Sequence, residues 1–88
     1  MEIIYMNSYL KAIKKIKNLE LISNLKIAVE DVEKANTITE VSNVKKLSGF
    51  SNCFRIRVEN YRIGLVLDKN VITFVRFEHR KDIYKKFP

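Results

Sequence analysis

The spacing of apolar residues changes near the middle of the chain, and this change constrains the fold more than any other feature. In residues 7–34, apolar side chains recur at three- and four-residue steps, which is typical of amphipathic helices. In residues 53–77, apolar and polar side chains alternate in short runs separated by turn residues, which is typical of strands. A helical half followed by a strand half predicts an α+β fold, with helices covering one face of a small sheet.

The helical half follows a short apolar run, Glu2–Met6, which predicts an opening strand. Asn7 or Ser8 is expected to cap a first helix that ends near Asn18. A second helix is predicted from about Leu19 to Lys34, and the two helices form a hairpin that needs another surface to bury its apolar stripe. The expected stripe of the second helix consists of Ile22, Leu25, Val29 and Val32.

The strand half predicts an antiparallel meander whose second face stays open and basic. Its strands are expected at residues 44–47, 53–58, 61–67 and 71–77, followed by a short closing helix at 81–87. A two-residue turn at Glu59–Asn60 places Arg57 directly across from Arg62. Like charges at such positions repel, so this pair is most easily tolerated with an anion between the two side chains. The same register places Arg55 opposite Gly64, whose missing side chain leaves room for a close approach to the backbone.

The positive charge is concentrated in the second half. Residues 1–44 hold six Lys/Arg and six Asp/Glu, whereas residues 45–88 hold eleven and four, so the whole net charge of +7 lies there. Such an asymmetry suggests a polyanionic partner. The longest apolar runs are far shorter than the roughly 20 residues that span a bilayer. No basic segment precedes an apolar stretch after Met1, so we expect a single cytoplasmic domain, residues 1–88, with no membrane partner. The lone Cys53 is expected to be a small apolar strand residue.

Four short motifs follow one another along the chain. They are Lys46-Leu47-Ser48-Gly49, Phe54-Arg55-Ile56-Arg57-Val58, Tyr61-Arg62-Ile63 and Val75-Arg76-Phe77-Glu78-His79-Arg80-Lys81-Asp82-Ile83-Tyr84. In this order and spacing they closely resemble the RelE/ParE superfamily of toxins from type II toxin–antitoxin systems. The resemblance implies a RelE-like fold, with a small mixed sheet, an N-terminal helical hairpin on one face and a short C-terminal helix. It also implies a cognate acidic antitoxin as a partner.

The RelE branch of that superfamily cuts messenger RNA in the ribosomal A site without a metal or other cofactor. The resemblance therefore implies that mRNA and the ribosome are partners of this chain, and that a 2′-hydroxyl attacks the adjacent phosphate to leave a 2′,3′-cyclic phosphate. Carried over residue by residue, the catalytic positions are Arg62, His79, Arg80 and Tyr84, and the RNA- and phosphate-binding positions are Arg55, Arg57, Lys46, Arg76 and Lys81. The arginines would stabilise charge on the phosphate, and His79 or Tyr84 would move protons, with the choice of acid and base left open.

Two other functions compete with mRNA cleavage. A ParE-like toxin would inhibit DNA gyrase by binding, but such members generally lack the basic strand pair combined with a C-terminal His/Arg and Tyr. A non-catalytic RNA-binding module would expose stacking aromatics on the open face, whereas Phe54 and Tyr61 fall on the predicted core face. The lysines of the first helix, Lys11, Lys14, Lys15 and Lys17, are expected to form a solvated face.

Overall fold

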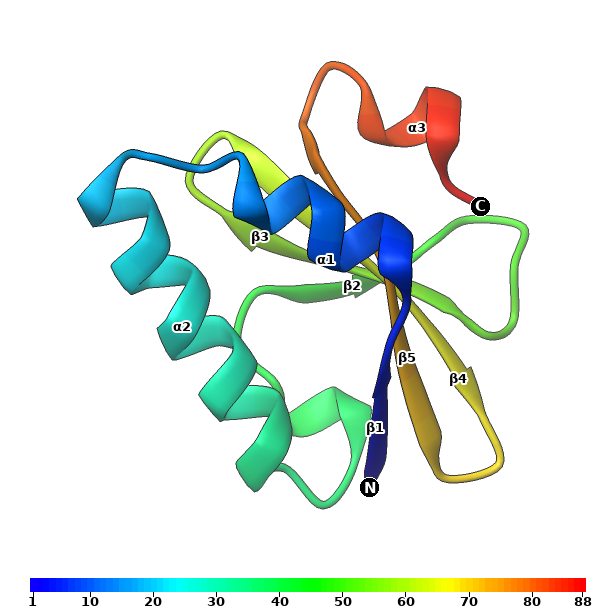
Figure 1. Ribbon diagram of the computed structural model, residues 1–88. Coiled ribbons are helices and arrows are strands. Elements are labelled where there is room, and N and C mark those ends of the chain that lie inside the picture. Colours follow the sequence, from blue (N-terminus) through cyan, green and yellow to red (C-terminus); the bar gives the residue numbers. More distant parts are fainter.

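The computed structural model describes residues 1–88 as a five-stranded mixed sheet, with two helices packed on one face and a short third helix near the C-terminus (Figure 1). The elements are β1 (Glu2–Tyr5), α1 (Asn7–Lys14), α2 (Leu19–Lys34), the 3-10 turn η1 (Ile38–Glu40), β2 (Val44–Lys46), β3 (Cys53–Val58), β4 (Tyr61–Asp68), β5 (Val71–His79) and α3 (Ile83–Lys86). The strand order is β1-β5-β4-β3-β2, with β1 parallel to β5 and all other neighbours antiparallel. The predicted α+β class is confirmed, and no helix is long and apolar enough to cross a membrane.

The start of α1 differs from the prediction. Met6 occupies the N-cap position without a side-chain hydrogen bond, so the expected cap at Asn7 or Ser8 is wrong. The Ser8 hydroxyl instead donates to a backbone carbonyl of β5 and thereby fastens the helix to the sheet. Asn18, expected at the end of the first helix, begins the second, because its side chain accepts a hydrogen bond from the amide of Leu21 at 3.0 Å.

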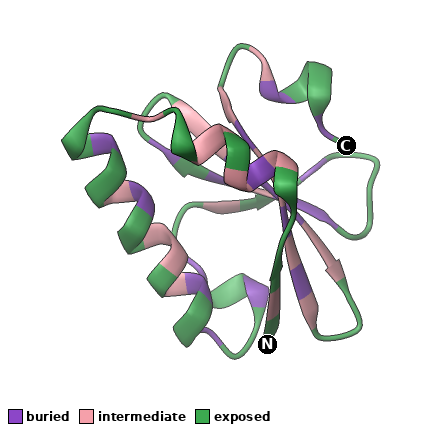
Figure 2. Cartoon of the chain, in the orientation of Figure 1, coloured by how far each residue is buried: buried purple, intermediate pink, exposed green.

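Helix α2 has the predicted bounds but buries a different stripe. Leu21, Leu25 and Val32 are buried, and Ala28 lies half-buried between them, so the stripe recurs at a 4-3-4 spacing (Figure 2). The expectation that Ile22 belongs to the core is wrong, because this side chain is 41% exposed. It lines an apolar groove between α1 and α2. The helix is therefore rotated slightly from the predicted orientation, so that Leu21 takes the core position expected for Ile22.

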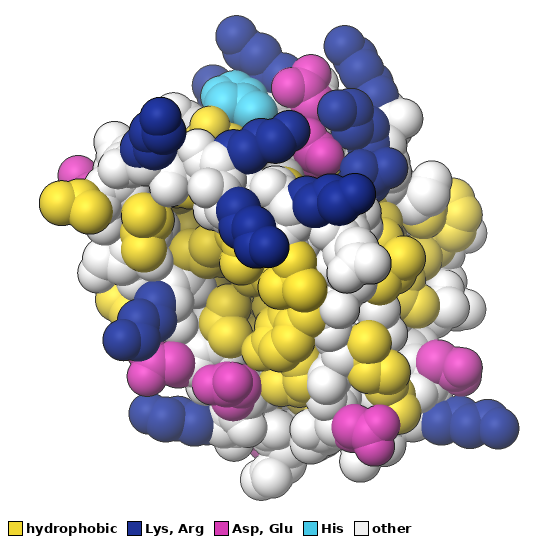
Figure 3. Space-filling model, in the orientation of Figure 1, with side chains coloured by type: hydrophobic (Ala, Val, Ile, Leu, Met, Phe, Trp, Pro, Cys, Tyr) yellow, Lys and Arg dark blue, Asp and Glu magenta, His cyan; other side chains and the backbone are white.

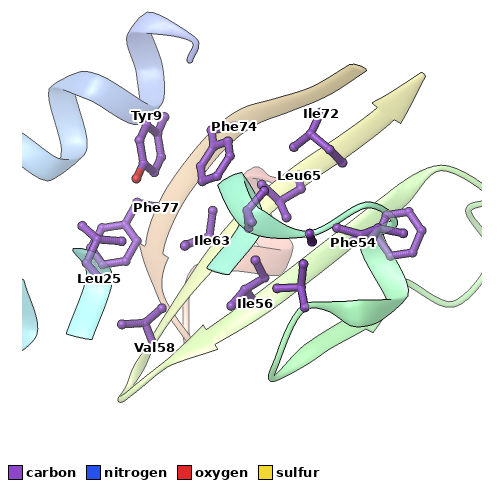
Figure 4. Close-up of a cluster of buried hydrophobic side chains, with 14 of the residues drawn as sticks. Tyr9, Leu25, Phe54, Ile56, Val58, Ile63, Leu65, Ile72, Phe74 and Phe77 are labelled. Carbon is purple, nitrogen blue, oxygen red and sulfur yellow. The ribbon is translucent and has the colours of Figure 1, made fainter. Parts of the chain in front are cut away.

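The main core lies between these helices and the sheet. Tyr9 of α1 meets Phe74 of β5 edge-on, with ring centroids 5.1 Å apart, and Figure 4 shows both rings beside the aliphatic side chains of β3 and β4. Ile63, Leu65 and Phe74 are completely buried. The apolar alternation predicted for β4 is thus confirmed, and one face of the sheet is committed to the core.

The β3–β4 register agrees with the sequence expectation. Val58 pairs with Tyr61, and Arg57 lies opposite Arg62. Glu59 has a left-handed φ of 54°, which closes the tight two-residue turn between the strands. The next hairpin contains a register shift between Gly64 and Leu65, so the same alternation cannot be continued onto β5 from sequence spacing alone.

A smaller apolar cluster lies on the other face of the sheet and fixes the end of the chain. It is built from Leu47, Cys53, Ile83 and Phe87, with Val66 and Val75 packed against it. The C-terminal segment therefore covers part of the face that was expected to stay open, and that expectation is wrong for this part of the sheet. Cys53 is buried in this cluster as an unpaired thiol, in agreement with its expected role as a small apolar strand residue.

Candidate functional site

Arg62 lies at the centre of a group of arginines on the sheet face opposite the main core. Its position on β4 alternates with the buried Ile63, and its side chain folds back over the β3–β4 turn. Nη1 donates hydrogen bonds to the carbonyl oxygens of Tyr61 at 2.8 Å and Glu59 at 3.1 Å. These two bonds orient the guanidinium and leave its second amino group available to an anion.

The surroundings of Arg62 are strongly positive. Partial burial lowers the pKa of Arg62 from its usual value, and the neighbouring charges of Arg55, Arg57 and Arg80 lower it further, while Tyr84 acts in the opposite direction. The four arginines and Tyr84 are therefore close enough to interact electrostatically. Clustered like charges repel one another, and a bound anion would relieve that repulsion.

Arg80 reaches this group because of a backbone contact between two turns. The amide of Arg80, just after β5, donates to the carbonyl oxygen of Asn60 in the β3–β4 turn at 2.8 Å. The same turn is tied to α2 by a hydrogen bond from Asn24 to the Glu59 carboxylate at 2.6 Å. As a result, Arg80 lines one cleft together with Arg57 and Arg62.

The arginines around Arg62 have no carboxylate partners. The two ion pairs of the molecule join Glu78 to Arg76 and to Lys86, each at 3.7 Å. Arg55, Arg57, Arg62 and Arg80 form none. Their guanidinium groups are thus free of ion pairs, as expected of side chains that bind phosphate. Arg76, by contrast, is already paired with Glu78 and is not among the groups that act on Arg62.

Tyr84 is the one candidate for proton transfer that the structure brings to the arginines. It lies on α3 and is 60% exposed, whereas its neighbours Ile83 and Phe87 are buried in the smaller apolar cluster. The side chain is therefore not part of that buried cluster. It lines a cleft with Arg55 and influences the ionisation of Arg62, so its hydroxyl stands at the edge of the arginine group.

The structure places His79 away from Arg62. His79 pairs with Tyr61 across the sheet, and the two rings meet edge-on with centroids 5.4 Å apart. Tyr61 packs against the main core. His79 lies directly opposite Tyr61, so its side chain is on the core side of the sheet, whereas the side chain of Arg62 is on the opposite side. The His79 Nδ1 atom also accepts a hydrogen bond from the backbone amide of Lys81 at 3.2 Å. The side chain of Lys81 is exposed beside this turn.

One basic residue was missed by sequence reasoning. In the β2–β3 register, Lys45 lies opposite Arg55 and hence on the arginine face, whereas the predicted Lys46 lies opposite Phe54. Both lysines line the cleft that contains Tyr84. Lys45 could have been identified from the β2–β3 register. The length of the loop at residues 47–52 does not fix that register, so the sequence alone did not give it.

Basic side chains also gather on the face of the molecule that carries α1 and α2 (Figure 3). Most Lys and Arg side chains visible in Figure 3 lie in the upper part of the view, above a central area of hydrophobic side chains. The abundance of these basic side chains agrees with the net charge of +7.

Comparisons with known proteins identify the class to which this fold and site belong. No family model matches the sequence. The chain is 33% identical to Toxin RelE3 of Methanocaldococcus jannaschii over 89 aligned positions, which cover the whole of both proteins. It also superposes on a chain of the RelB-RelE antitoxin-toxin complex from Methanococcus jannaschii with a TM-score of 0.79 and 32% identity, covering 97% of this chain and 99% of that one.

A more distant structure shares the fold alone. The YoeB dimer from Staphylococcus aureus superposes with a TM-score of 0.70 at 12% identity, covering 90% of this chain and 95% of that one. The fold and the full-length similarity together define a small toxin of the toxin–antitoxin class. The chain belongs to the RelE family of these toxins.

Proposed function

We propose that this toxin is an endoribonuclease that cuts messenger RNA on the ribosome and thereby inhibits translation. The observation that carries the proposal is the group of four unpaired arginines around Arg62 with the exposed Tyr84 beside it. Guanidinium groups match phosphate oxygens in geometry and charge, and membership of the RelE family supports RNA as the source of the phosphate.

The chemistry we propose is an in-line attack within the RNA strand. A base removes the proton of a 2′-hydroxyl, the O2′ atom bonds to the adjacent phosphorus, and the bond from phosphorus to O5′ breaks. The leaving O5′ atom takes up a proton, so the products are a 2′,3′-cyclic phosphate and a 5′-hydroxyl. Negative charge builds on the phosphate oxygens during the attack, and preorganised cations stabilise such charge strongly.

The proposed roles follow from the positions of the side chains. Arg62, Arg57 and Arg80 line one cleft and would hold the phosphate oxygens. Arg55 lines the adjoining cleft with Tyr84, whose exposed hydroxyl would transfer a proton at the scissile bond. His79, on the other side of the sheet, would act on the position of the turn at residues 79–82 through its contact with Lys81.

We propose that the ribosome holds the substrate in the conformation that cleavage requires. The arginine group can stabilise a strained phosphate, but in-line attack also needs the 2′-oxygen aligned opposite the leaving oxygen. We propose that mRNA held in the ribosomal A site supplies that alignment, and that free RNA is cut poorly. Several Lys/Arg–phosphate contacts would make ribosome binding weaken steeply with salt.

An antitoxin is the second proposed partner. The Methanococcus jannaschii relative, and a Pyrococcus horikoshii relative with 19% identity, are each known as a RelE–RelB complex. We propose that this chain likewise binds a cognate antitoxin, and that the antitoxin is acidic because the toxin carries a net charge of +7. The alternative function, ParE-like inhibition of gyrase, receives no support from these relatives and is not retained.

Induction of the gene in bacteria tests the proposal. Growth and translation should arrest, and Arg62→Ala or Arg80→Ala should each relieve the arrest while circular dichroism stays native. Lys69→Asn is the matched control, because it removes one charge at the opposite end of β4 and asparagine tolerates the left-handed φ of 51° found there. If both arginine variants fold and stay fully toxic, the proposed phosphate site is wrong. Inhibition of gyrase without cut mRNA would instead favour the ParE-like function.

A further inference from the structure

We propose that the loop between β2 and β3, residues 47–52, holds a nucleobase of the bound RNA, with the ring of Phe50 as the surface on which the base stacks. This inference rests on the proposed function and extends it from the phosphate to the base of a neighbouring nucleotide.

The distribution of exposed apolar side chains points to this loop. Most of the large hydrophobic residues that are strongly exposed lie in the first third of the chain: Ile4, Tyr5, Met6, Leu19, Ile22 and Ile27. The second half exposes two, Phe50 at 48% and Tyr84 at 60%, and both are aromatic. These two aromatic side chains line one cleft together with Arg55, and the C-terminus lies beside the loop in Figure 1.

The charges around Phe50 fit a nucleic-acid strand. The cleft that it lines contains Lys45, Lys46 and Arg55 and no acidic side chain. The cleft on the other side of Arg62 also contains three acidic side chains, Glu30, Asp31 and Glu59. The Phe50 cleft, with basic side chains and no acidic ones, therefore attracts a phosphate chain held at the arginine group more strongly than the cleft along α2 does. Because Arg55 lines the Phe50 cleft and also acts on Arg62, the stacked base belongs to a nucleotide next to the scissile phosphate.

The loop is anchored so that Phe50 is presented to solvent. Leu47 is buried in the smaller apolar cluster, and its carbonyl oxygen accepts a hydrogen bond from the amide of Phe50 at 3.3 Å. Gly49 has a φ of +84°, a conformation that glycine adopts without strain. Because the backbone of the loop is already ordered, little conformational freedom of the loop is lost when a base stacks on the ring, which favours binding.

Cleavage assays on ribosomes carrying a defined mRNA test the stacking role. Stacking of a base on an aromatic ring is worth 1–3 kcal/mol, so Phe50→Ala should lower kcat/KM by about 5- to 150-fold. Phe50→Trp should retain activity, and Phe50→Leu, which keeps apolar bulk without a ring, should resemble Phe50→Ala. Leu19→Ala is the control, since it removes an 81% exposed apolar side chain from α2. Removing the base from one nucleotide at a time should impair the wild type at one position and leave Phe50→Ala unaffected by that change.

A binding measurement separates this inference from the proposed function. A short 2′-O-methyl RNA, which cannot be cut, would carry the fluorescent base 2-aminopurine next to the target phosphate. Wild type and Phe50→Trp should quench its fluorescence by stacking, and Phe50→Ala should bind without quenching. Equal quenching by wild type and Phe50→Ala, or a Phe50→Leu variant as active as wild type, would overturn the stacking role. Quenching by a wild type that cuts no mRNA would instead contradict the proposed reaction.

Discussion

The ring of Phe87 lies directly on the backbone of Gly64, so that a Cβ atom added at Gly64 would stand 2.8 Å from the ring. Gly64 lies opposite Arg55 in the sheet, and Phe87 follows Tyr84 by three residues. The contact therefore sets where the C-terminal segment crosses the arginine face. The room beside Arg55 that the sequence indicated is real, but Phe87 of the protein itself occupies it.

Gly64→Ala should displace this anchor and with it Tyr84. We expect the sheet to persist, since overpacking of this kind costs about 1–3 kcal/mol, and we expect mRNA cleavage to fall at least about tenfold. Adding Phe87→Leu to Gly64→Ala should restore part of the activity, because leucine is smaller and can yield to the new methyl group. Cleavage rates and circular dichroism of the two single variants and the double variant measure this coupling. A fully active Gly64→Ala variant, or a double variant less active than Gly64→Ala, would show that the contact does not position Tyr84.

Arg57 and Arg62 face one another across β3 and β4. Under the proposed function, this like-charge pair destabilises the free protein and favours the binding of a phosphate. Arg57→Ala should keep or raise the free energy of unfolding, by a few tenths of a kcal/mol, because it removes a like-charge pair. The same variant should bind ribosomes more weakly, and the slope of log K against log salt concentration should fall in magnitude by about one, as expected for the loss of one phosphate contact. Arg57→Lys keeps the charge and is the control for both measurements. Lower stability of Arg57→Ala together with unchanged binding would contradict a role in phosphate binding.

Tyr84→Phe should separate chemistry from folding. The ring is mostly exposed, so thermal stability should change little, whereas cleavage should fall by roughly 10²-fold or more if the hydroxyl carries the proton. His79→Gln should retain most of the cleavage rate, because this side chain lies on the other side of the sheet from Arg62. Single-turnover cleavage by both variants is the measurement. The opposite pattern, with His79→Gln inactive and Tyr84→Phe normal, would assign proton transfer to the histidine.

The stability of the fold should decline at alkaline pH because of Tyr9, which belongs to the main core, and Tyr5, which stacks beside it. Burial raises the pKa of Tyr9 well above its usual range, and burial together with the negative charge of Glu33 raises the pKa of Tyr5. An unfolded tyrosine ionises near pH 10, so above that pH the unfolded chain binds fewer protons than the folded one. The stabilising contribution is complete below pH about 10 and is lost as pH rises toward the folded pKa. Urea unfolding between pH 8 and 11 should show this slope, and Tyr9→Phe should flatten it.

Much of the sheet could be predicted because its signals are local. The alternation in residues 53–58 and 61–67 and the two-residue turn between them fix the pairing of Arg57 with Arg62. The next hairpin could not be read in this way, because the register shift after Gly64 breaks the alternation. For the same reason the sequence does not give the face on which Arg76 lies, which follows from its cross-strand pairing with Gly64.

The sequence predicted which residues form the candidate site more fully than it predicted how they are arranged. The motif supplied the arginines and Tyr84, but not the side of the sheet on which His79 lies, because that depends on its cross-strand pairing with Tyr61. Lys45 was missed because a loop of six residues does not determine the β2–β3 register. The helix N-cap was wrong because the Ser8 hydroxyl is used in a contact with β5, 67 residues away in sequence.

The central claim is that the arginine group and Tyr84 promote attack by a 2′-hydroxyl on the adjacent phosphate. The most direct measurement uses ribosomes carrying an mRNA in which the nucleotide 5′ to the cut has either its 2′-hydroxyl or a 2′-hydrogen. We predict that the normal mRNA is cut to a 2′,3′-cyclic phosphate and a 5′-hydroxyl, and that the 2′-deoxy mRNA is left intact. Cleavage of the 2′-deoxy mRNA at the normal rate, or products with a 3′-hydroxyl and a 5′-phosphate, would contradict the account.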